Sequence, residues 1–206
     1  MSNYYWDQQI TGYLVHQQRE RELNEGLDTI SELDWKEMVS NGEVCYKHHT
    51  IKLKKQRLFE NALEIPLPVV LAPVANAFLE KGKDDRIRNQ YLFMNDTGEI
   101  SCGIHLGESI EAGIDLEMLK DCMLIESKFR KPEIKLFELE SESIKLRGFE
   151  TYDCLIQTEN GQFYQFVFLT VCRDRLLHGS FQFKAEQADI WRPMSAAIIQ
   201  TIIFFE

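Results

Sequence analysis

The sequence lacks long hydrophobic runs and a cysteine framework. Its longest apolar stretches, 67–74 and 198–205, are interrupted by proline or polar residues and are much shorter than the roughly 20 residues that span a bilayer. We therefore expect no membrane span. The five cysteines are an odd number without a Cys-x-x-Cys pair, which excludes an even disulfide framework and indicates reduced thiols in the cytoplasm. The polar N-terminus also predicts no secretory signal.

Basic residues are fewer than acidic ones. The 206 residues include 33 acidic and 23 basic side chains, a net charge of −10, which argues against a nucleic-acid partner because Lys and Arg grip the phosphate backbone. The sequence has no phosphate-binding G-x-x-x-x-G-K-[ST] loop and no G-x-S-x-G hydrolase motif. We predict no cofactor, no metal and no catalytic residue, and hence a protein that is not an enzyme.

The charge is distributed unevenly. The first 50 residues carry nine acids and four bases, a net charge of −5, whereas residues 47–57 contain five bases and no acid. The bases alternate with Ile51 and Leu53, which favours an exposed edge strand guarded by lysines. The hypotheses for this run are a solvated edge, docking onto the acidic N-terminal segment, or contact with a partner protein through Lys52, Lys54 and Lys55.

Aromatic residues are unexpected in so polar an N-terminal segment. These residues are Tyr4, Tyr5, Trp6 and Trp35. They either form a docking surface for a partner or pack back onto the sheet and order the segment. A helix is expected over 13–25, and a second over 32–40 after the capping box that begins at Ser31. We expect residues 1–50 to be an acidic helical extension and residues 51–206 to be the folded domain.

The rest of the chain is rich in strand patterns. The turn at 95–98 and Asn160-Gly161 predict hairpins, and such short connections enforce antiparallel pairing. Helices are expected from Asp115 to about 128 and from Asp189 onward, with Pro193 in the first turn of the latter. The expected strands are 58–67, 90–94, 99–106, 133–140, 144–158, 162–172 and 176–184. The predicted fold class is α+β, an antiparallel sheet with flanking helices.

This order of elements resembles the PsbP-like α/β/α sandwich superfamily, which includes Ran-binding release factors and DcrB-like proteins. The resemblance covers about 150 residues. It rests on 58–62, Pro66-Leu67-Pro68, 88–93, the acidic helix from Asp115, the Asn160-Gly161 hairpin and the helix after Trp191. The resemblance implies an α/β/α sandwich and a binding or accessory role, in some members that of a chaperone.

Three pairs of side chains have the residue types of a metal or nucleophile site: Cys45 with His48, Cys102 with His105, and Cys172 with His178. Residues three apart on a strand point to opposite faces, which disfavours the first two as metal ligands. Buried core cysteines are the favoured interpretation for the third. The acids Glu138 and Glu140 alternate on a strand, as on an ordinary solvated face.

These observations favour a non-catalytic cytoplasmic binding protein, an adaptor or a chaperone that recognises a partner protein. The first alternative is a small-molecule-binding or enzymatic domain with a pocket between the sheet and the helices. The second is a toxin-neutralising partner protein, suggested by the acidity alone. The sequence does not indicate the oligomeric state.

Overall fold

A computed structural model describes residues 30–74, 90–110, 113–130, 135–139, 148–159 and 161–205. The chain divides into two compact units, Met1–Asp34 and Trp35–Glu206. Within the second unit, residues 43–46 pair as a strand with residues 49–52, and the expected division between residues 1–50 and 51–206 stays a prediction. The helix expected over 13–25 lies outside the described residues.

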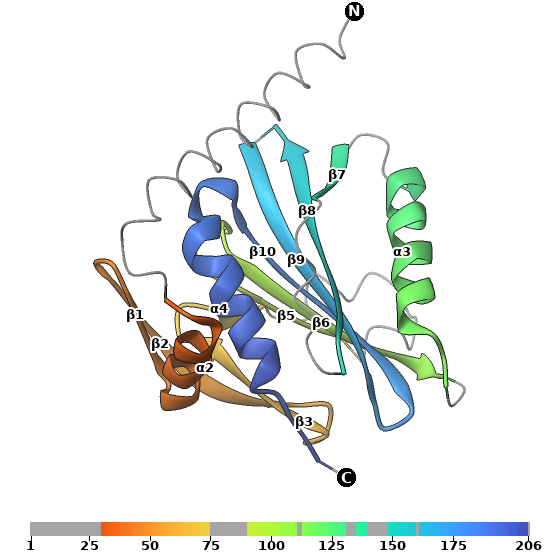
Figure 1. Cartoon of the computed structure of the whole chain (residues 1–206), viewed down its shortest axis with the longest axis horizontal. Helices are drawn as coiled ribbons and strands as arrows, with labels where there is room; N and C mark the ends of the chain where they lie inside the picture. Colours follow the sequence, from red (N-terminus) through yellow and green to blue (C-terminus); the bar gives the residue numbers. More distant parts are fainter. Residues whose placement is uncertain are drawn as a thin grey trace, which may run out of the picture. The chain divides into compact units, whose positions relative to one another are not determined.

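Strands of the described ranges form two antiparallel sheets (Figure 1). The smaller sheet has the order β1-β2-β3-β11, with β1 (Glu43–Tyr46), β2 (His49–Leu58), β3 (Leu63–Pro68) and β11 (Ile203–Phe204). The larger has the order β4-β5-β6-β10-β9-β8-β7, with β4 (Ala72–Pro73), β5 (Gln90–Met94), β6 (Ser101–Ser109), β7 (Lys135–Leu139), β8 (Glu150–Thr158), β9 (Gly161–Cys172) and β10 (Arg175–Lys184). The helices are α2 (Glu32–Asn41), α3 (Leu116–Arg130), the 3₁₀ turn η3 (Ala185–Gln187) and α4 (Ala188–Gln200).

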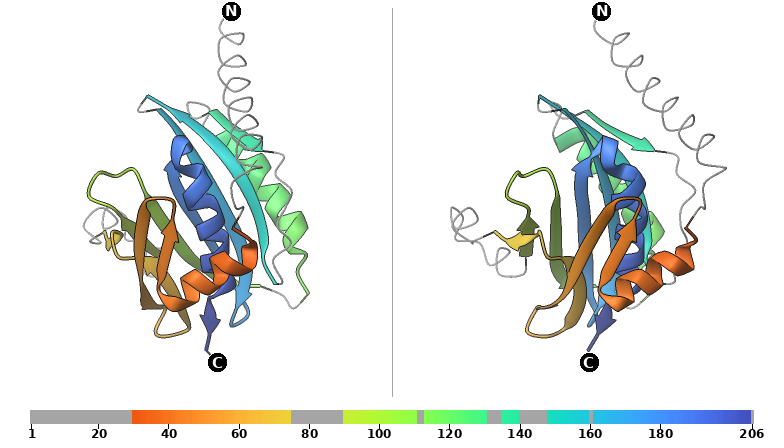
Figure 2. Two further views of the ribbon diagram at one scale, coloured as in Figure 1. Left: turned by 60° about the vertical axis from the view of Figure 1, so that its left-hand side comes forward. Right: turned by 90° about the vertical axis from the view of Figure 1, so that its left-hand side faces the viewer.

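The core of the second unit is built around α4, which contacts β3 of the smaller sheet and β9 and β10 of the larger (Figure 2). Residues 194–199 are buried without interruption, and the Trp191 ring stacks on Phe183 of β10 at a centroid distance of 6.3 Å. A helix covered from two sides needs apolar residues around most of its circumference. This helix begins at Ala188, so Pro193 lies in its second turn rather than in the first, where we had predicted it.

Alternation along the strands gives the larger sheet two different faces. The face against α4 carries the fully buried rings of Phe166, Phe168, Phe181 and Phe183. The opposite face, called here the α3 face, is partly covered by α3, which contacts β7, β8 and β9. The expected α+β fold with flanking helices is confirmed, although the second sheet was not foreseen.

Several local signals behave as predicted. Ser31 N–H donates to Asp34 Oδ2 (3.0 Å) and Asp34 N–H donates to Ser31 Oγ (3.3 Å), which is the reciprocal bonding of a capping box. In the turn between β5 and β6, Asn95 Oδ1 accepts the Ile100 N–H (3.0 Å) and Gly98 has a φ of 73°. No helix in the described ranges is both long and apolar enough to cross a membrane.

The expectation for the segment after the basic run was wrong. The continuous strand over 58–67 is interrupted by a turn, in which Phe59, Glu60 and Asn61 all have positive φ. Strand β2 lies between β1 and β3 in the sheet, but the two neighbours pair with different halves of it: β1 with residues 49–52 and β3 with residues 53–58. Lys54 and Lys55 are exposed on the half that pairs with β3 alone, as on the lysine-guarded edge expected from the sequence.

Candidate functional site

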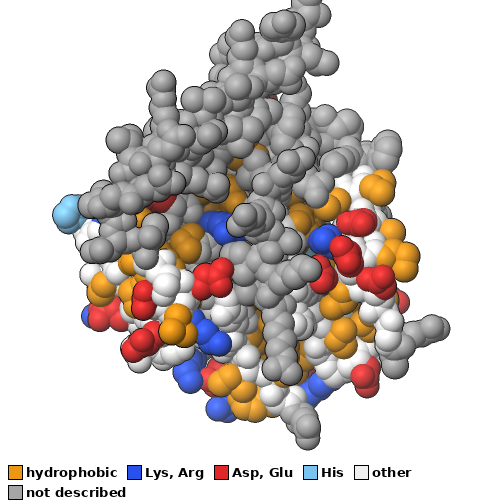
Figure 3. Space-filling view, in the orientation of Figure 1, with side chains coloured by type: hydrophobic (Ala, Val, Ile, Leu, Met, Phe, Trp, Pro, Cys, Tyr) orange, Lys and Arg blue, Asp and Glu red, His pale blue; other side chains and the backbone are white. Residues whose placement is uncertain are grey.

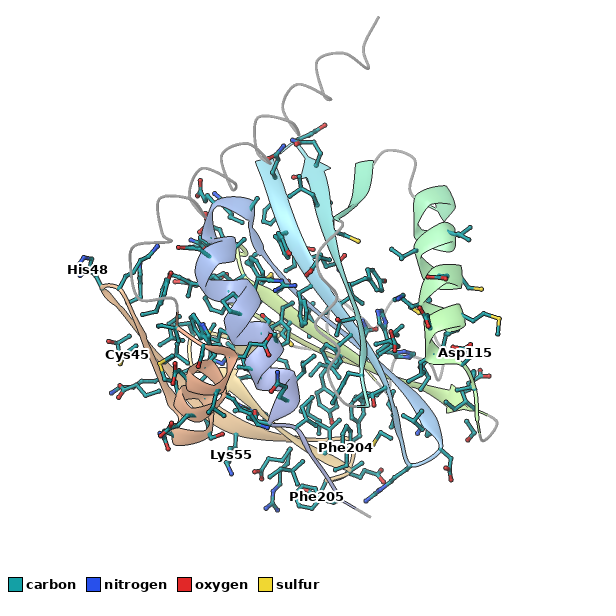
Figure 4. All side chains as sticks on the ribbon, in the orientation of Figure 1. Cys45, His48, Lys55, Asp115, Phe204 and Phe205 are labelled. Carbon is teal, nitrogen blue, oxygen red and sulfur yellow. The ribbon has the colours of Figure 1, made fainter. Side chains whose placement is uncertain are left out.

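Helix α3 begins at the cap predicted from the sequence. Asp115 Oδ1 accepts hydrogen bonds from the backbone N–H groups of Glu117 (2.9 Å) and Met118 (3.2 Å). These bonds satisfy two of the donors that a helix N-terminus leaves free. Figure 4 shows Asp115 at the N-terminal end of the helix. The predicted helix and its start are confirmed.

Apolar side chains occupy two faces of α3. On the face toward the sheet, Leu124 is buried and Leu116, Leu119 and Met123 are half-buried. On the other face, Met118 is 60% and Ile125 57% exposed, and Cys122 is exposed between them. We call Met118, Cys122 and Ile125 the α3 stripe. Cys122 therefore belongs to the outer face.

Acidic side chains border the α3 stripe. Glu117 and Asp121, four residues apart and thus aligned along the helix, are both exposed. Figure 3 shows apolar and acidic side chains next to one another over α3. The basic residue in this part of the helix is Lys120. Its side chain is only 16% exposed, and its Nζ lies 3.7 Å from Glu150 Oε2 on β8. The exposed face of α3 is therefore both apolar and negatively charged.

A histidine pair lies on the α3 face of the larger sheet. His105 of β6 and His178 of β10 are direct cross-strand partners. Burial, and secondarily the neighbouring His105, lowers the pKa of His178 to about 4. Burial, followed by the charge of Arg175, lowers the pKa of His105. Both imidazoles are therefore neutral at pH 7.

The structure separates the Cys–His pairs that the sequence singled out. Cys102 is buried on the α4 face, whereas its neighbour His105 lies on the α3 face. Cys172 is also on the α4 face and His178 on the α3 face, so these two cannot form a nucleophile–base pair. Cys45 lies within β1, whereas His48 is at the tip of the β1–β2 hairpin (Figure 4). Among the described residues, no group of three or more His, Cys, Asp or Glu could hold a metal ion.

The lysines predicted to bind a partner all lie on β2. Lys52, Lys54 and Lys55 are exposed. Lys55 Nζ is 3.1 Å from Glu64 Oε1, and Arg57 Nε is 3.2 Å from Glu64 Oε2. These charge-assisted hydrogen bonds, that from Lys55 first, lower the pKa of Glu64. Docking of the run onto the N-terminal acids stays a prediction, because most of those acids precede residue 30.

Of the four aromatic residues in the N-terminal segment, only Trp35 is described. Its side chain is 5% exposed, and its ring packs against Tyr46 of β1 with centroids 5.3 Å apart. This position matches the packing alternative and leaves little of the ring for a partner. Tyr4, Tyr5 and Trp6 lie outside the described residues.

A buried ion pair, which the sequence gave no signal for, ties α4 to the larger sheet. Arg192 Nη2 is 3.0 Å from Asp153 Oδ2 on β8, and Asp153 is only 2% exposed. Burial, and next the Asp153 carboxylate, raises the pKa of the adjacent Tyr164. Because this cluster is covered by the helix, we assign it to stability rather than to binding.

Comparison with known proteins identifies the fold. No protein-family model and no curated protein sequence matches the chain. Among solved structures, cyanobacterial PsbP (CyanoP) from Synechocystis sp. PCC 6803 aligns with a TM-score of 0.57 and 12% sequence identity, over 79% of this chain and 98% of that chain. The chain has the PsbP-like fold. The resemblance seen in the sequence is thus confirmed at the level of the fold.

Two other similar structures have lower scores. The Ran-binding protein Mog1p of Saccharomyces cerevisiae has a TM-score of 0.48 at 12% identity, over 75% of this chain and 96% of that chain. Protein PA94 of Pseudomonas aeruginosa has a TM-score of 0.45 at 14% identity, over 75% and 98% respectively. A PsbP-like fold does not by itself specify a ligand, so the function has to be argued from this chain's own surface.

Proposed function

We propose that this PsbP-like chain is a non-catalytic protein-binding domain that serves as an adaptor or chaperone for a partner protein in the cytoplasm. The observation that supports the proposal is the α3 stripe, where Met118 and Ile125 are each more than half exposed. Fully burying a Met or Ile side chain is worth about 1.5–3 kcal/mol. A partner that covers both side chains therefore gains the kind of central apolar contact that dominates protein interfaces.

Site-specific photo-crosslinking in the source cell tests this proposal. A photoreactive residue replaces Met118 or Ile125 in the full chain, and in a matched control it replaces Val70, which is 58% exposed but far along the chain from α3. We expect a discrete adduct with one partner protein from both α3 positions and none from the control. Absence of an adduct at α3, or the same adducts from Val70, would refute the proposal.

One observation favours the alternative of a small-molecule-binding or enzymatic domain, namely the His105–His178 pair. Two neutral imidazoles side by side can bind a polar ligand. A general base, however, works best with a pKa near the operating pH, and the pKa of His178 is about 4. An NMR titration of the chain with a metabolite extract of the source cell distinguishes the two functions. Shifts confined to His105 and His178 would favour the alternative.

A further inference from the structure

We infer that the α3 stripe binds a basic amphipathic helix of the partner protein; this inference rests on the protein-binding function proposed above. Met118 and Ile125 are seven residues apart, which is two helical turns or about 10 Å along the axis. That distance matches the spacing at which an amphipathic helix repeats its apolar residues. A helix laid along α3 would place two successive apolar anchors on these two side chains.

The charges around the stripe specify the sign of the charge that the partner carries. Asp115, Glu117 and Asp121 are all exposed along the first two turns of α3. Lys120, the base within residues 114–125, is turned toward the sheet and neutralised by Glu150. The Asp115 carboxylate is engaged in capping the helix N-terminus, so the surface offers the two negative charges of Glu117 and Asp121 beside the apolar stripe, and Lys or Arg residues on the partner complement them.

The position of the acids also restricts how the partner lies. Each helical residue advances by about 100°, so Glu117 and Asp121 both fall on one side of the line from Met118 to Ile125. On the other side, the helix surface turns back toward half-buried Leu119 and the sheet. A partner helix with its basic residues along one flank thus fits in one orientation. Basic residues on the other flank as well would add little to the binding affinity.

The same charges disfavour other occupants. A second copy of the chain would bring the acids of one α3 against the acids of the other, and like charges across an interface are unfavourable. Anionic lipid and nucleic acid would be repelled for the same reason. Glu117 and Asp121 therefore favour a basic protein segment over each of these.

A pair of synthetic 18-residue helical peptides tests the inference. One peptide has Leu at amphipathic spacing with Lys along one flank, and the other has Glu in place of each Lys. Fluorescence anisotropy measures binding of each peptide to the full chain at low and high salt. We expect the Lys peptide to bind about tenfold more tightly than the Glu peptide, with an affinity that falls as salt screens the charges.

Two double variants and their matched controls localise the binding. The Glu117→Lys/Asp121→Lys variant should reverse the peptide preference, whereas Glu43→Lys/Asp96→Lys, which makes the same change in net charge at exposed sites elsewhere, should not. The Met118→Gln/Ile125→Gln variant should weaken binding of the Lys peptide about tenfold. Val69→Gln/Val70→Gln, at residues that are 59% and 58% exposed, should leave it unchanged.

Other outcomes would overturn the inference. Equal effects of Glu117→Lys/Asp121→Lys and its control would mean that only net charge matters, and equal effects of Met118→Gln/Ile125→Gln and its control would mean that the α3 stripe is not the binding surface. A dimer that dissociates on Met118→Gln/Ile125→Gln substitution would identify a second copy as the occupant. Binding to anionic vesicles that is lost in the same variant would identify a membrane. Photo-crosslinked adducts at α3 without a preference for the Lys peptide would refute this inference but not the protein-binding function. The absence of adducts would refute both.

Discussion

The half-buried His178 of the histidine pair predicts how stability depends on pH. The folded-state pKa of His178, about 4, lies below the ordinary value of 6.5. The unfolded chain therefore takes up a proton between pH 6.5 and pH 4 that the folded chain does not. The stability contributed by the neutral imidazole is fully present above pH 6.5 and is lost as the pH falls through this window.

The size of the loss follows from the two pKa values. Between pH 7 and pH 5 the full shift corresponds to a decrease of about 2 kcal/mol in the free energy of unfolding. The His178 ring is half-buried, so solvent screens part of the effect. We therefore expect the free energy of unfolding to decrease by about 1–2 kcal/mol. The pKa of His105, lowered first by burial and then by Arg175, changes stability in the same direction.

Urea unfolding at pH 7, 6 and 5, followed by tryptophan fluorescence, measures this loss, since Trp35 and Trp191 are both buried in the folded chain. Carboxylates also begin to titrate near pH 5, so the decisive quantity is the difference between the wild type and His178→Gln. We expect the variant to lose about 1–2 kcal/mol less than the wild type from pH 7 to pH 5. His48→Gln, at an exposed position in the β1–β2 turn, should behave as the wild type. Equal losses in His178→Gln and the wild type would refute the reasoning.

Two further predictions concern the core. The replacement Arg192→Met leaves the Asp153 carboxylate, which is 2% exposed, without its ion-pair partner. It should lower the free energy of unfolding by about 3–5 kcal/mol. An effect below about 1 kcal/mol in the same urea assay would contradict the assignment of this ion pair to stability. Replacement Gly179→Ala places a Cβ against the Phe168 ring and should destabilise by about 1–3 kcal/mol. Gly103→Ala, where the nearest atom is 3.9 Å away, is the matched control, and equal melting temperatures of the two variants would show that the ring moves aside freely.

Much of the fold could be predicted because its signals are local. Asp115 caps α3 through bonds to its own next residues, and Asn95 closes the turn before β6 in the same way. Such contacts depend only on a few consecutive residues, so the sequence shows them directly. The two-residue strand β11 has no such signal, because it exists only through its pairing with β3, about 140 residues earlier.

The basic run shows what alternation along a strand reveals and what it does not. The alternation of Ile51 and Leu53 with lysines predicted a strand, and β2 is that strand. The run looked like an edge because lysines guard exposed edges. In the structure β1 pairs with residues 49–52 and β3 with residues 53–58, so Lys54 and Lys55 have β3 as a neighbour on one side, and Lys55 and Arg57 share Glu64 across that pairing. Alternation reveals a strand, but its neighbours depend on contacts distant in sequence.

The α3 stripe escaped prediction because α3 has apolar residues on two sides. Periodicity alone cannot say which side faces the sheet when Met118 and Ile125 oppose Leu116 and Leu124 around one helix. The contacts that place the helix are distant in sequence: Leu124 is buried, α3 contacts β7, β8 and β9, and Lys120 Nζ lies 3.7 Å from Glu150 Oε2 on β8, 30 residues later. Lys120 lies nearly opposite the stripe around the helix axis. With that side of the helix against the sheet, Met118 and Ile125 face solvent, so the packing that places α3 also exposes the surface proposed for the partner.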